Sequence, residues 1–331
     1  MPSCWGCCRS PWLEVVSITC WVCRYNDLHV FELQEPTRVI EWIGEKSVCV
    51  AGYENSRRNE ILQLLLPQKL YVKEKQGLCP ERDFKVERGG FSDHPVYGLR
   101  HVPDTSLLVT SGPPDSSLQV WQLAAEDTAS SSSEEVSGLE FLDCNTLLAC
   151  CVKGQLCLAD VRQPQSPLGD ASVPSALSGE QWCMGVSPGL QGSDVNAPTI
   201  ARLSSGGQLT LTDLRNIPKP LKSAKCKVSA ASPSAEFLCV SWAPVLDGCL
   251  AISGFNGTVH IYDTRSWPES GGEAEPLFSH KGHIFSGMDN GSDFPLVTTH
   301  AWHPWKPKML LSAASDGSLH VWDWAKYHRN S

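Results

Sequence analysis

Short runs of alternating apolar and polar residues, separated by turn residues, recur in pairs along most of this chain. The clearest pair is 310–323, where a Ser-Asp-Gly-Ser turn separates Leu310-Leu-Ser-Ala-Ala from Leu-His-Val-Trp322. Alternation with a period of two is typical of a half-buried strand, and an Asp-Gly pair favours the tight turn of a hairpin. We therefore predict that each pair is a β-hairpin.

The hairpins repeat, and each is preceded by one more apolar strand. We expect hairpins at 48–65, 107–121, 147–160, 200–213, 249–263 and 310–323, and the preceding strands at 39–43, 96–101, 138–142, 182–186, 237–242 and 297–302. Four closing aspartates recur roughly every 50 to 60 residues, which suits four strands and long connections per unit; they are Asp160, Asp213, Asp263 and Asp323. Helix-period patterns are scarce, so the fold is predicted to be all-β.

The last unit opens with Gly282-His283 and ends with Trp322-Asp323. A Gly-His opening and a Trp-Asp ending at this spacing are typical of one blade of a WD-repeat β-propeller. We therefore predict a propeller with six recognisable blades. In such repeats four residue types form a buried structural tetrad, in which the aspartate fixes the histidine tautomer. We assign this tetrad to His283, Ser312, Asp316 and Trp322; a catalytic Ser-His-Asp set is the alternative interpretation.

The first alternating stretch, 25–33, precedes the first unit and has no hairpin partner of its own. A propeller must join its first blade to its last, or unpaired sheet edges remain. The chain stops within eight residues of Asp323, so the last blade lacks its own outer strand. We predict that Leu28–Leu33 supplies that strand; a free N-terminal strand is the alternative.

Composition excludes several classes of function. The formal charge is −9 and Lys/Arg runs never exceed two residues, so the footprint of a nucleic-acid or anionic-membrane binder is absent. The uncharged segment 15–23 is too short to span a membrane, and Arg9 and Glu14 interrupt any signal peptide. Many of the 15 cysteines lie inside predicted strands, which fits a reducing compartment. We expect a cytoplasmic protein, with a nuclear location also open.

The N-terminus is rich in cysteine. Two Cys-x-x-Cys pairs, Cys4 with Cys7 and Cys20 with Cys23, offer four thiolates that could bind Zn²⁺. The segment between them lacks the turn residues of a compact zinc ribbon. We therefore expect residues 1–24 to be a poorly ordered leader and predict no metal, with zinc as the alternative.

Evidence for catalysis is thin. Gly185-Val-Ser187-Pro-Gly189 matches the nucleophile elbow of α/β-hydrolases, but that elbow requires a helix after the serine, which Pro188 disfavours. No phosphate-binding loop or metalloprotease motif is present. We predict a protein that is not an enzyme and needs no cofactor, with a serine hydrolase as the alternative of another class.

Several sequence blocks are more specific than the Gly-His and Trp-Asp pattern of WD repeats. They resemble the WD repeat-containing protein 73 family of propellers. They include Arg38-Val-Ile-Glu-Trp42-Ile, Val50-Ala-Gly-Tyr53, Pro80-Glu-Arg-Asp-Phe-Lys-Val86, Gly89-Gly-Phe-Ser-Asp93, Leu118-Gln-Val-Trp-Gln122, Leu250-Ala-Ile-Ser-Gly-Phe255 and Leu296-Val-Thr-Thr-His300. The resemblance covers about 25–123 and 134–324. It implies one propeller domain over 25–326, followed by a tail at 327–331.

The chain departs from the family pattern in two places. Residues 1–24 differ from the family's short acidic leader. Only 38 residues separate Gln122 from Asp160, and a Ser/Glu-rich linker at 124–135 stands where the family continues into another blade. Six units therefore remain where seven are expected. Either the linker forms a weak outer strand and six blades close the ring, or a blade is missing and the ring is strained or open.

The resemblance implies a non-catalytic adaptor. Such proteins are associated with assembly of the RNA endonuclease module of the Integrator complex in the cytoplasm, so its subunits are the expected protein partners. The family is also linked to microtubules, spindle poles and the cleavage furrow in cell division, which gives the alternative function.

Propellers bind partners through loops on a rigid scaffold. Two long loops, 80–95 and 280–295, carry apolar side chains among polar ones, a mixture that suits partner recognition. The candidate partner-binding residues are Arg82, Phe84, Phe91, Ile284, Phe285 and Met288. Trp267 and Trp305, in turns of the opposite face, mark a second candidate surface.

Overall fold

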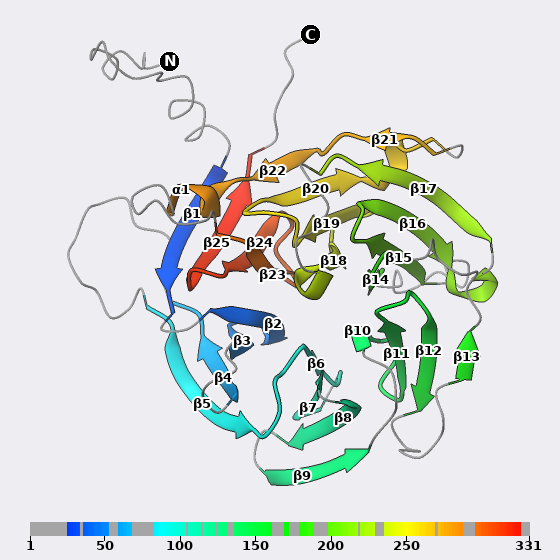
Figure 1. Cartoon of the computed structure of the whole chain (residues 1–331). Coiled ribbons are helices and arrows are strands. Elements are labelled where there is room, and N and C mark those ends of the chain that lie inside the picture. The colour runs from blue at the N-terminus through cyan, green and yellow to red at the C-terminus, as the bar shows by residue number, and fades with distance from the viewer. Residues whose placement is uncertain are drawn as a thin grey trace, which may run out of the picture.

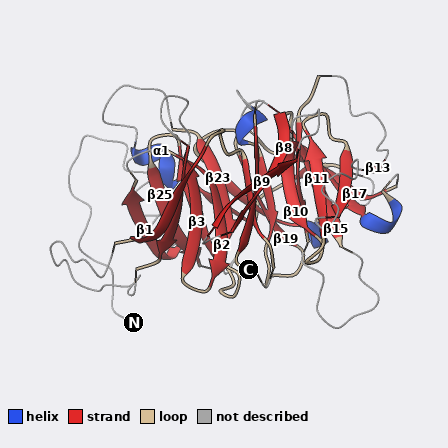
Figure 2. Cartoon of the chain, turned by 90° about the horizontal axis from the view of Figure 1, so that it is seen from below, coloured by secondary structure: helices blue, strands red, loops and turns tan. Residues whose placement is uncertain are grey.

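Six β-sheets surround a central channel in the computed structural model of the chain (Figure 1). The structure describes residues 25–33, 36–52, 59–67, 83–103, 105–113, 115–122, 125–130, 136–160, 169–171, 179–187, 198–217, 219–228, 235–268, 271–286 and 295–325. Figure 2 shows the ring from the side: strands make up almost all of it, and helices are confined to short turns. No helix among the described residues is long and apolar enough to cross a membrane.

The first three blades each run from an inner strand at the channel to an outer strand at the rim. Blade 1 comprises β2 (Thr37–Gly44), β3 (Ser47–Gly52), β4 (Asn59–Leu65) and β5 (Lys85–Ser92). Blade 2 comprises β6 (Gly98–His101), β7 (Leu107–Gly112), β8 (Asp115–Gln122) and β9 (Ala125–Ser130). Blade 3 comprises β10 (Val136–Phe141), β11 (Thr146–Cys151), β12 (Leu156–Asp160) and β13 (Gly169–Ala171).

The other three blades follow the same plan, with two departures. Blade 4 comprises β14 (Trp182–Val186), β15 (Thr199–Ser204), β16 (Gln208–Asp213) and β17 (Pro220–Cys226), and β21 (Glu273–Ala274) joins it as a parallel fifth strand. Blade 5 comprises β18 (Cys239–Trp242), β19 (Cys249–Ser253), β20 (Val259–Asp263) and β22 (Phe278–His280). Blade 6 comprises β23 (Val297–Trp302), β24 (Met309–Ala314), β25 (Ser318–Trp324) and, out of chain order, β1 (Tyr25–Glu32). Short helices η3 (Leu214–Asn216), η4 (Ala235–Phe237), η5 (Thr264–Ser266) and α1 (Gly282–Ser286) lie in the connections.

The N-terminal strand closes the ring, as predicted. β1 pairs antiparallel with β25, with Leu28 opposite Trp322 and Glu32 opposite Ser318. The Leu33 N–H extends the ladder by donating to Gly317 O at 3.0 Å. Figure 1 shows the blue β1 against the red β25. The outer edge of the last blade is therefore built by the start of the polypeptide.

Six blades complete the circle without a gap. The inner strands β2, β6, β10, β14, β18 and β23 contact one another in that order, and β23 contacts β2 again. The segment 124–135, predicted as a linker, provides β9, which pairs with β8 through Leu118–Ser130 and Val120–Thr128. Of the two alternatives, the weak outer strand in a closed six-bladed ring is the one that the structure adopts.

Apolar packing between neighbouring blades holds the ring together. A separate cluster of buried side chains fills each of the six junctions, so every blade packs on both of its neighbours. Fully burying one aliphatic or aromatic side chain contributes about 1.5–3 kcal/mol. Most described cysteines belong to these cores as free thiols, and burial raises the pKa of Cys226 to about 12. Such thiols behave as small apolar side chains.

Candidate functional site

The four residues assigned to the tetrad lie together inside blade 6. Trp322 Nε1 donates to Ser312 Oγ over 3.1 Å, and Ser312 Oγ lies 2.8 Å from His283 Nε2. On the other side of the His283 imidazole, Nδ1 lies 2.8 Å from Ser318 Oγ, whose hydroxyl donates to Asp316 Oδ1 over 2.6 Å. Because Asp316 accepts the Ser318 proton, Ser318 Oγ accepts from Nδ1–H. His283 Nε2 then accepts the Ser312 proton, and all hydrogens point from Trp322 towards Asp316.

Ser318 is a fifth member that the sequence analysis missed. Asp316 was expected to fix the histidine tautomer itself, but it acts through Ser318, whose backbone N–H also donates to Asp316 Oδ1 at 3.0 Å. The Ser-Asp-Gly-Ser turn that marked the hairpin contains this serine, so the signal was present. Ser312, His283 and Trp322 are 0% exposed. With no access for a substrate, the geometry supports a structural role over a catalytic one.

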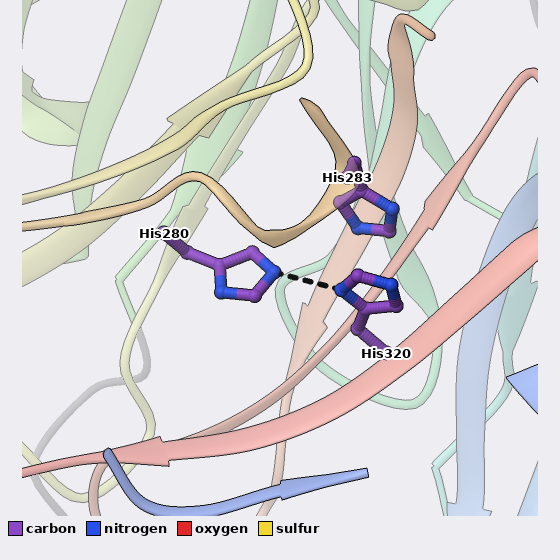
Figure 3. A group of neighbouring side chains, drawn as sticks. All are labelled: His280, His283 and His320. Carbon is purple, nitrogen blue, oxygen red and sulfur yellow. Dashed lines mark hydrogen bonds between the residues drawn. The ribbon is translucent and has the colours of Figure 1, made fainter. Parts of the chain in front are cut away.

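Two more buried histidines adjoin the tetrad (Figure 3). His280 Nε2 lies 3.1 Å from His320 Nδ1, and the Tyr25 hydroxyl lies 2.8 Å from His280 Nδ1. His280 also stacks on Trp322 with ring centroids 4.4 Å apart. The cluster therefore joins three strands that are distant in the chain: β1, β22 of blade 5 and β25 of blade 6.

The three histidines resemble a metal site in composition but not in arrangement. The rings of His283 and His320 are stacked 3.8 Å apart at 11°, so the lone pairs of their nitrogens lie in parallel planes and do not converge. Both nitrogens of His283 already bind serines. Burial, followed by repulsion from the neighbouring imidazoles, holds the pKa of His280 and of His283 well below 6.5, so both rings are neutral. The four cysteines of the alternative zinc site lie outside the described residues.

A cavity of about 480 Å³ occupies the central channel and is lined by the inner strands of all six blades. On the side of blades 1–3 its wall carries Glu41, Arg100 and Glu140, which we call the charged arc. Arg100 Nη1 pairs with Glu41 Oε2 at 2.9 Å, and Arg100 Nη2 pairs with Glu140 Oε1 at 2.7 Å. Arg100 Nε donates to Leu139 O at 2.7 Å, and His101 N donates to Glu41 Oε1 at 3.1 Å. One guanidinium thus bridges three blades.

Burial raises the pKa of Glu41, assisted by repulsion from Glu140 and opposed by attraction to Arg100. The three side chains are 19–26% exposed. They are therefore reachable from the channel, although they are largely withdrawn from water. Burial of the carboxyl group, more than repulsion from Glu140, is the cause of the raised pKa.

The wall on the side of blades 4–6 carries neutral groups, which we call the neutral arc. His300 binds Ser241 Oγ through Nε2 at 2.7 Å and Ser253 Oγ through Nδ1 at 2.8 Å. Trp302 Nε1 donates to Ser241 O, and Trp242 Nε1 donates to the carbonyl of Gly185, both at 3.2 Å. Burial lowers the pKa of His300 to about 3, so this imidazole is neutral at neutral pH.

An ion pair between Arg38 and Glu236 lies at the end of the channel where the inner strands begin, and it joins blade 1 to the loop before blade 5. The Arg38 guanidinium lies 3.3 Å from the centroid of the Tyr97 ring of blade 2, within cation–π range. Arg38 Nη2 also donates to Glu236 O at 3.1 Å. This end is therefore already occupied by its own paired side chains.

The described candidate partner-binding residues lie on different elements: Phe84 directly precedes β5, Phe91 lies on β5 and Ile284 lies in α1. Phe84 is half-buried and packs edge-on against Phe31 with centroids 4.8 Å apart, whereas Phe91 is 56% exposed on β5. Ile284 in α1 is half-buried against the Gly257 turn. Arg82 and Met288 lie outside the described residues, as does the side chain of Phe285. The role of these loops stays a prediction.

The second candidate surface is half wrong. Trp267 is only 6% exposed, because it packs against Tyr262 with ring centroids 6.1 Å apart. Trp305 is 52% exposed.

The hydrolase interpretation gains nothing from Ser187, whose hydroxyl accepts the Thr199 backbone N–H at 2.9 Å where β14 ends.

The charged arc was the functional feature that the sequence analysis overlooked. Glu41, Arg100 and Glu140 occupy the same place in β2, β6 and β10, directly before Trp42, His101 and Phe141. A charged residue inside an apolar inner strand was the available signal. It gained meaning only when the ring brought the three strands side by side.

Comparison with known proteins finds relatives that are named as assembly factors. It is 47% identical over 354 aligned positions to the "Integrator complex assembly factor WDR73" of Mus musculus, covering 91% of this chain and 95% of that protein. The proteins of the same name from Xenopus laevis and Homo sapiens are each 44% identical, again over 91% of this chain and 95% and 94% of theirs. No protein-family model matches the chain.

The alignment also shows how many positions of the mouse protein have no counterpart in this chain. Its 354 positions exceed the chain's 331 residues, and 91% of the chain is about 300 residues. Roughly 50 positions of the mouse protein therefore have no counterpart here, close to the ~40–45 residues of one WD repeat. The shortfall fits a ring with one blade fewer.

Proposed function

The chain belongs to the WDR73 family of Integrator complex assembly factors, and we propose on that premise that it is a non-catalytic scaffold assisting assembly of the Integrator complex. The observation that carries the proposal is identity of 41–47% over 91% of the chain with four proteins of that name. Within the complex, the subunits of the RNA endonuclease module are the proposed partners, and the cytoplasm is the proposed place of assembly. Both details follow from the family resemblance.

The fold is suited to such a role. Six packed junctions and a closing strand make a rigid ring, and rigid scaffolds present loops to partners at a low entropic cost. The Ser-His sets found in the described residues are enclosed and bound to their own neighbours. These features support binding rather than turnover.

Partner capture tests the proposal. The tagged full chain, expressed in human cells, is expected to recover Integrator subunits, with those of the endonuclease module enriched over the rest. A matched pair of exposed apolar substitutions locates the contact: Phe91→Ser on β5 and Leu221→Ser on β17, whose side chains are 56% and 52% exposed. Recovery that falls with Phe91→Ser alone places the partner on the loop 80–95. Failure to recover any Integrator subunit contradicts the function.

A rescue experiment tests whether a ring of six blades is sufficient for assembly of the endonuclease module. Cells depleted of their own WDR73 relative are expected to regain assembled endonuclease module when this chain is expressed. If the chain binds subunits but does not restore assembly, the blade that it lacks is needed for the activity. If it neither binds nor restores, the proposed function is wrong.

A further inference from the structure

The turn between β23 and β24 of blade 6 presents a tryptophan to solvent. It spans residues 303–308 and lies at the end of the ring where the inner strands finish. Trp305 in this turn is 52% exposed. The turn of the same form in blade 5 has Val245 at that position, 46% exposed, so two neighbouring blades both expose an apolar side chain here. Tryptophan on a protein surface is a frequent anchor for a binding partner.

Hydrogen bonds fix the backbone of this turn. His303 N donates to Met309 O at 2.9 Å and closes it. His303 Nδ1 accepts the backbone N–H groups of Trp305 and Lys306 at 3.1 and 3.0 Å, while its buried ring packs on Trp42 of blade 1. Burial, and after it the charge of Lys306, lowers the pKa of His303 to about 4, so Nδ1 accepts both bonds at neutral pH. The backbone that carries Trp305 is therefore ordered before a partner binds, which limits the entropic cost of binding.

Lys308 holds a backbone conformation that favours glycine. Its φ is +69°, and among the residues that the structure describes it is the single non-glycine residue with a positive φ. The same position in blade 5 is Gly248, with a φ of +67°. Because glycine adopts this conformation without a steric penalty, the stability of the turn does not explain the lysine. Strained residues of this kind are concentrated at sites that bind ligands.

The turn carries two cations and no acid. Lys306 is exposed and Lys308 is half-buried, and neither forms an ion pair with a residue that the structure describes. One acid lies nearby, because Asp323 stands opposite Met309 in the ladder, and it accepts from Asn26 Nδ2 at 3.3 Å. This end of blade 6 therefore keeps one positive charge in excess.

The corresponding turns of other blades have the opposite charge or none. Asp143 lies in the turn of blade 3 and Asp247 in that of blade 5, and in blade 1 Glu45 is followed by Lys46. A long polyanion such as RNA would meet these acids, whereas a short acidic segment meets the two lysines of blade 6 alone. Repulsion from the flanking turns thus directs an acidic segment to blade 6.

We propose that the turn 303–308 binds a short acidic segment of a partner protein, in which aspartate or glutamate flanks an apolar side chain. The apolar side chain covers the Trp305 ring, and the carboxylates pair with Lys306 and Lys308. The tryptophan contributes most of the affinity, and the charges give orientation and a faster encounter.

The test uses the folded full chain and three fluorescein-labelled probes. Glu-Glu-Leu-Glu-Glu carries the proposed chemistry, Gln-Gln-Leu-Gln-Gln keeps its shape without charge, and a short oligouridylate carries phosphates instead. Fluorescence anisotropy measures binding at protein concentrations up to about 1 mM, because a contact with one turn is weak. We expect the acidic peptide to bind about fivefold more tightly than the glutamine peptide, since two exposed ion pairs are lost in the latter.

Three outcomes with these probes overturn the proposal. They are equal binding of the two peptides, no binding of the acidic peptide, and tighter binding of the oligouridylate. Self-association of the chain that Trp305→Ser abolishes would assign the turn to a second copy and also overturns it.

Variants with matched controls locate the site. Trp305→Ser is expected to weaken acidic-peptide binding about fivefold, whereas Leu221→Ser on β17, whose side chain is also 52% exposed, leaves it unchanged. Lys306→Gln is expected to weaken binding about threefold. Its control is Lys281→Gln, which follows β22 at the other end of the ring and leaves binding unchanged.

Lys308→Gly separates binding from stability. Glycine suits the backbone at this position, so the melting temperature is expected to stay the same or rise, while acidic-peptide binding weakens about threefold. Binding that ignores the Trp305, Lys306 and Lys308 variants overturns the site. No Integrator subunit is used, so failure here leaves the proposed assembly function standing, and failure of partner capture leaves this proposal standing.

Discussion

The two sides of the channel hold neighbouring blades together by different means. At the same position of the inner strand, blades 1–3 carry Glu41, Arg100 and Glu140, whereas blades 4 and 5 carry Gly185 and Ser241. The charged arc joins its blades through a shared guanidinium. The neutral arc joins its blades through indole N–H and imidazole contacts with the backbone and serines. One ring geometry is thus compatible with either chemistry.

The difference has consequences for stability. Paired charges in a partly buried site contribute little net stability but are costly to separate. Neutral polar networks, once satisfied, rigidify the structure without a charge that can be exposed. The charged arc is therefore the more vulnerable side of the channel, and the neutral arc is the supporting side.

The largest effect is expected from removing the central cation. Arg100→Met leaves Glu41 and Glu140 facing each other without a counter-ion, which should lower the free energy of unfolding by about 3–5 kcal/mol. The matched control is Arg265→Met, which breaks a pair with Asp263 of similar length, 2.8 Å, but with a 61% exposed arginine. That change should cost much less, because solvent screens the exposed pair. Chemical denaturation measures the free energy of unfolding of both variants. Similar losses in the two would contradict the expected difference between the buried and the exposed arginine.

Acidification should weaken the neutral arc. The pKa of His300 is lowered from 6.5 to about 3 by burial, so the folded state resists its protonation. Stability due to His300 is complete above pH 6.5 and is lost as the pH falls from there towards 3, by about 2 kcal/mol at pH 5. His320, lowered to about 4, acts in the same direction. The neutral variant His300→Asn should reduce this loss; an identical pH profile would refute the assignment.

A smaller effect on stability is expected from removing a single indole N–H donor. Trp302→Phe keeps most of the ring but removes the donor to Ser241 O, so about 1 kcal/mol of stability should be lost. Trp42→Phe is the informative comparison, because the Trp42 N–H has no acceptor among the described residues. That substitution should be nearly neutral or stabilising. Thermal melting of the two variants decides between these outcomes.

The smallest effect concerns the pH dependence of the charged arc. The pKa of Glu41 is raised by burial and by Glu140 against the attraction of Arg100, and the Cys49 thiol of the next strand faces the same carboxyl group. The folded state therefore holds this proton longer than the unfolded chain does. The contribution of Glu41 to stability falls as the pH rises from 4.5 through its raised pKa. Glu41→Gln should remove that fall, so its stability relative to the native chain increases between pH 4.5 and 7.

Local patterns were enough to predict the strands and the closure. Alternation predicted the hairpin of β7–β8, Asn-Gly and Asp-Gly turns marked those of β19–β20 and β24–β25, and the lone alternating stretch at 25–33 predicted β1. The number of blades could not be settled in the same way. β9 has the sequence Ala-Glu-Asp-Thr-Ala-Ser, which has little strand propensity, and it pairs because β8 offers an edge.

The sites depended more on tertiary structure. The tetrad residues were recognised from their spacing, but the relay through Ser318 required the turn geometry. The charged arc required knowledge of which strands become neighbours around a ring. A charge within an apolar strand has no assigned partner until the fold supplies one.

A closed ring of six blades requires that the N-terminal strand pairs with the last blade. Hydrogen–deuterium exchange of the purified chain tests this directly, since the amides of β1 bond to β25 only if the closure exists. We predict that those amides of residues 28–33 that bond to β25 exchange as slowly as the amides of β24 and β25. Exchange of residues 28–33 at the rate of an exposed loop, with β25 protected on one side only, would contradict the closed ring.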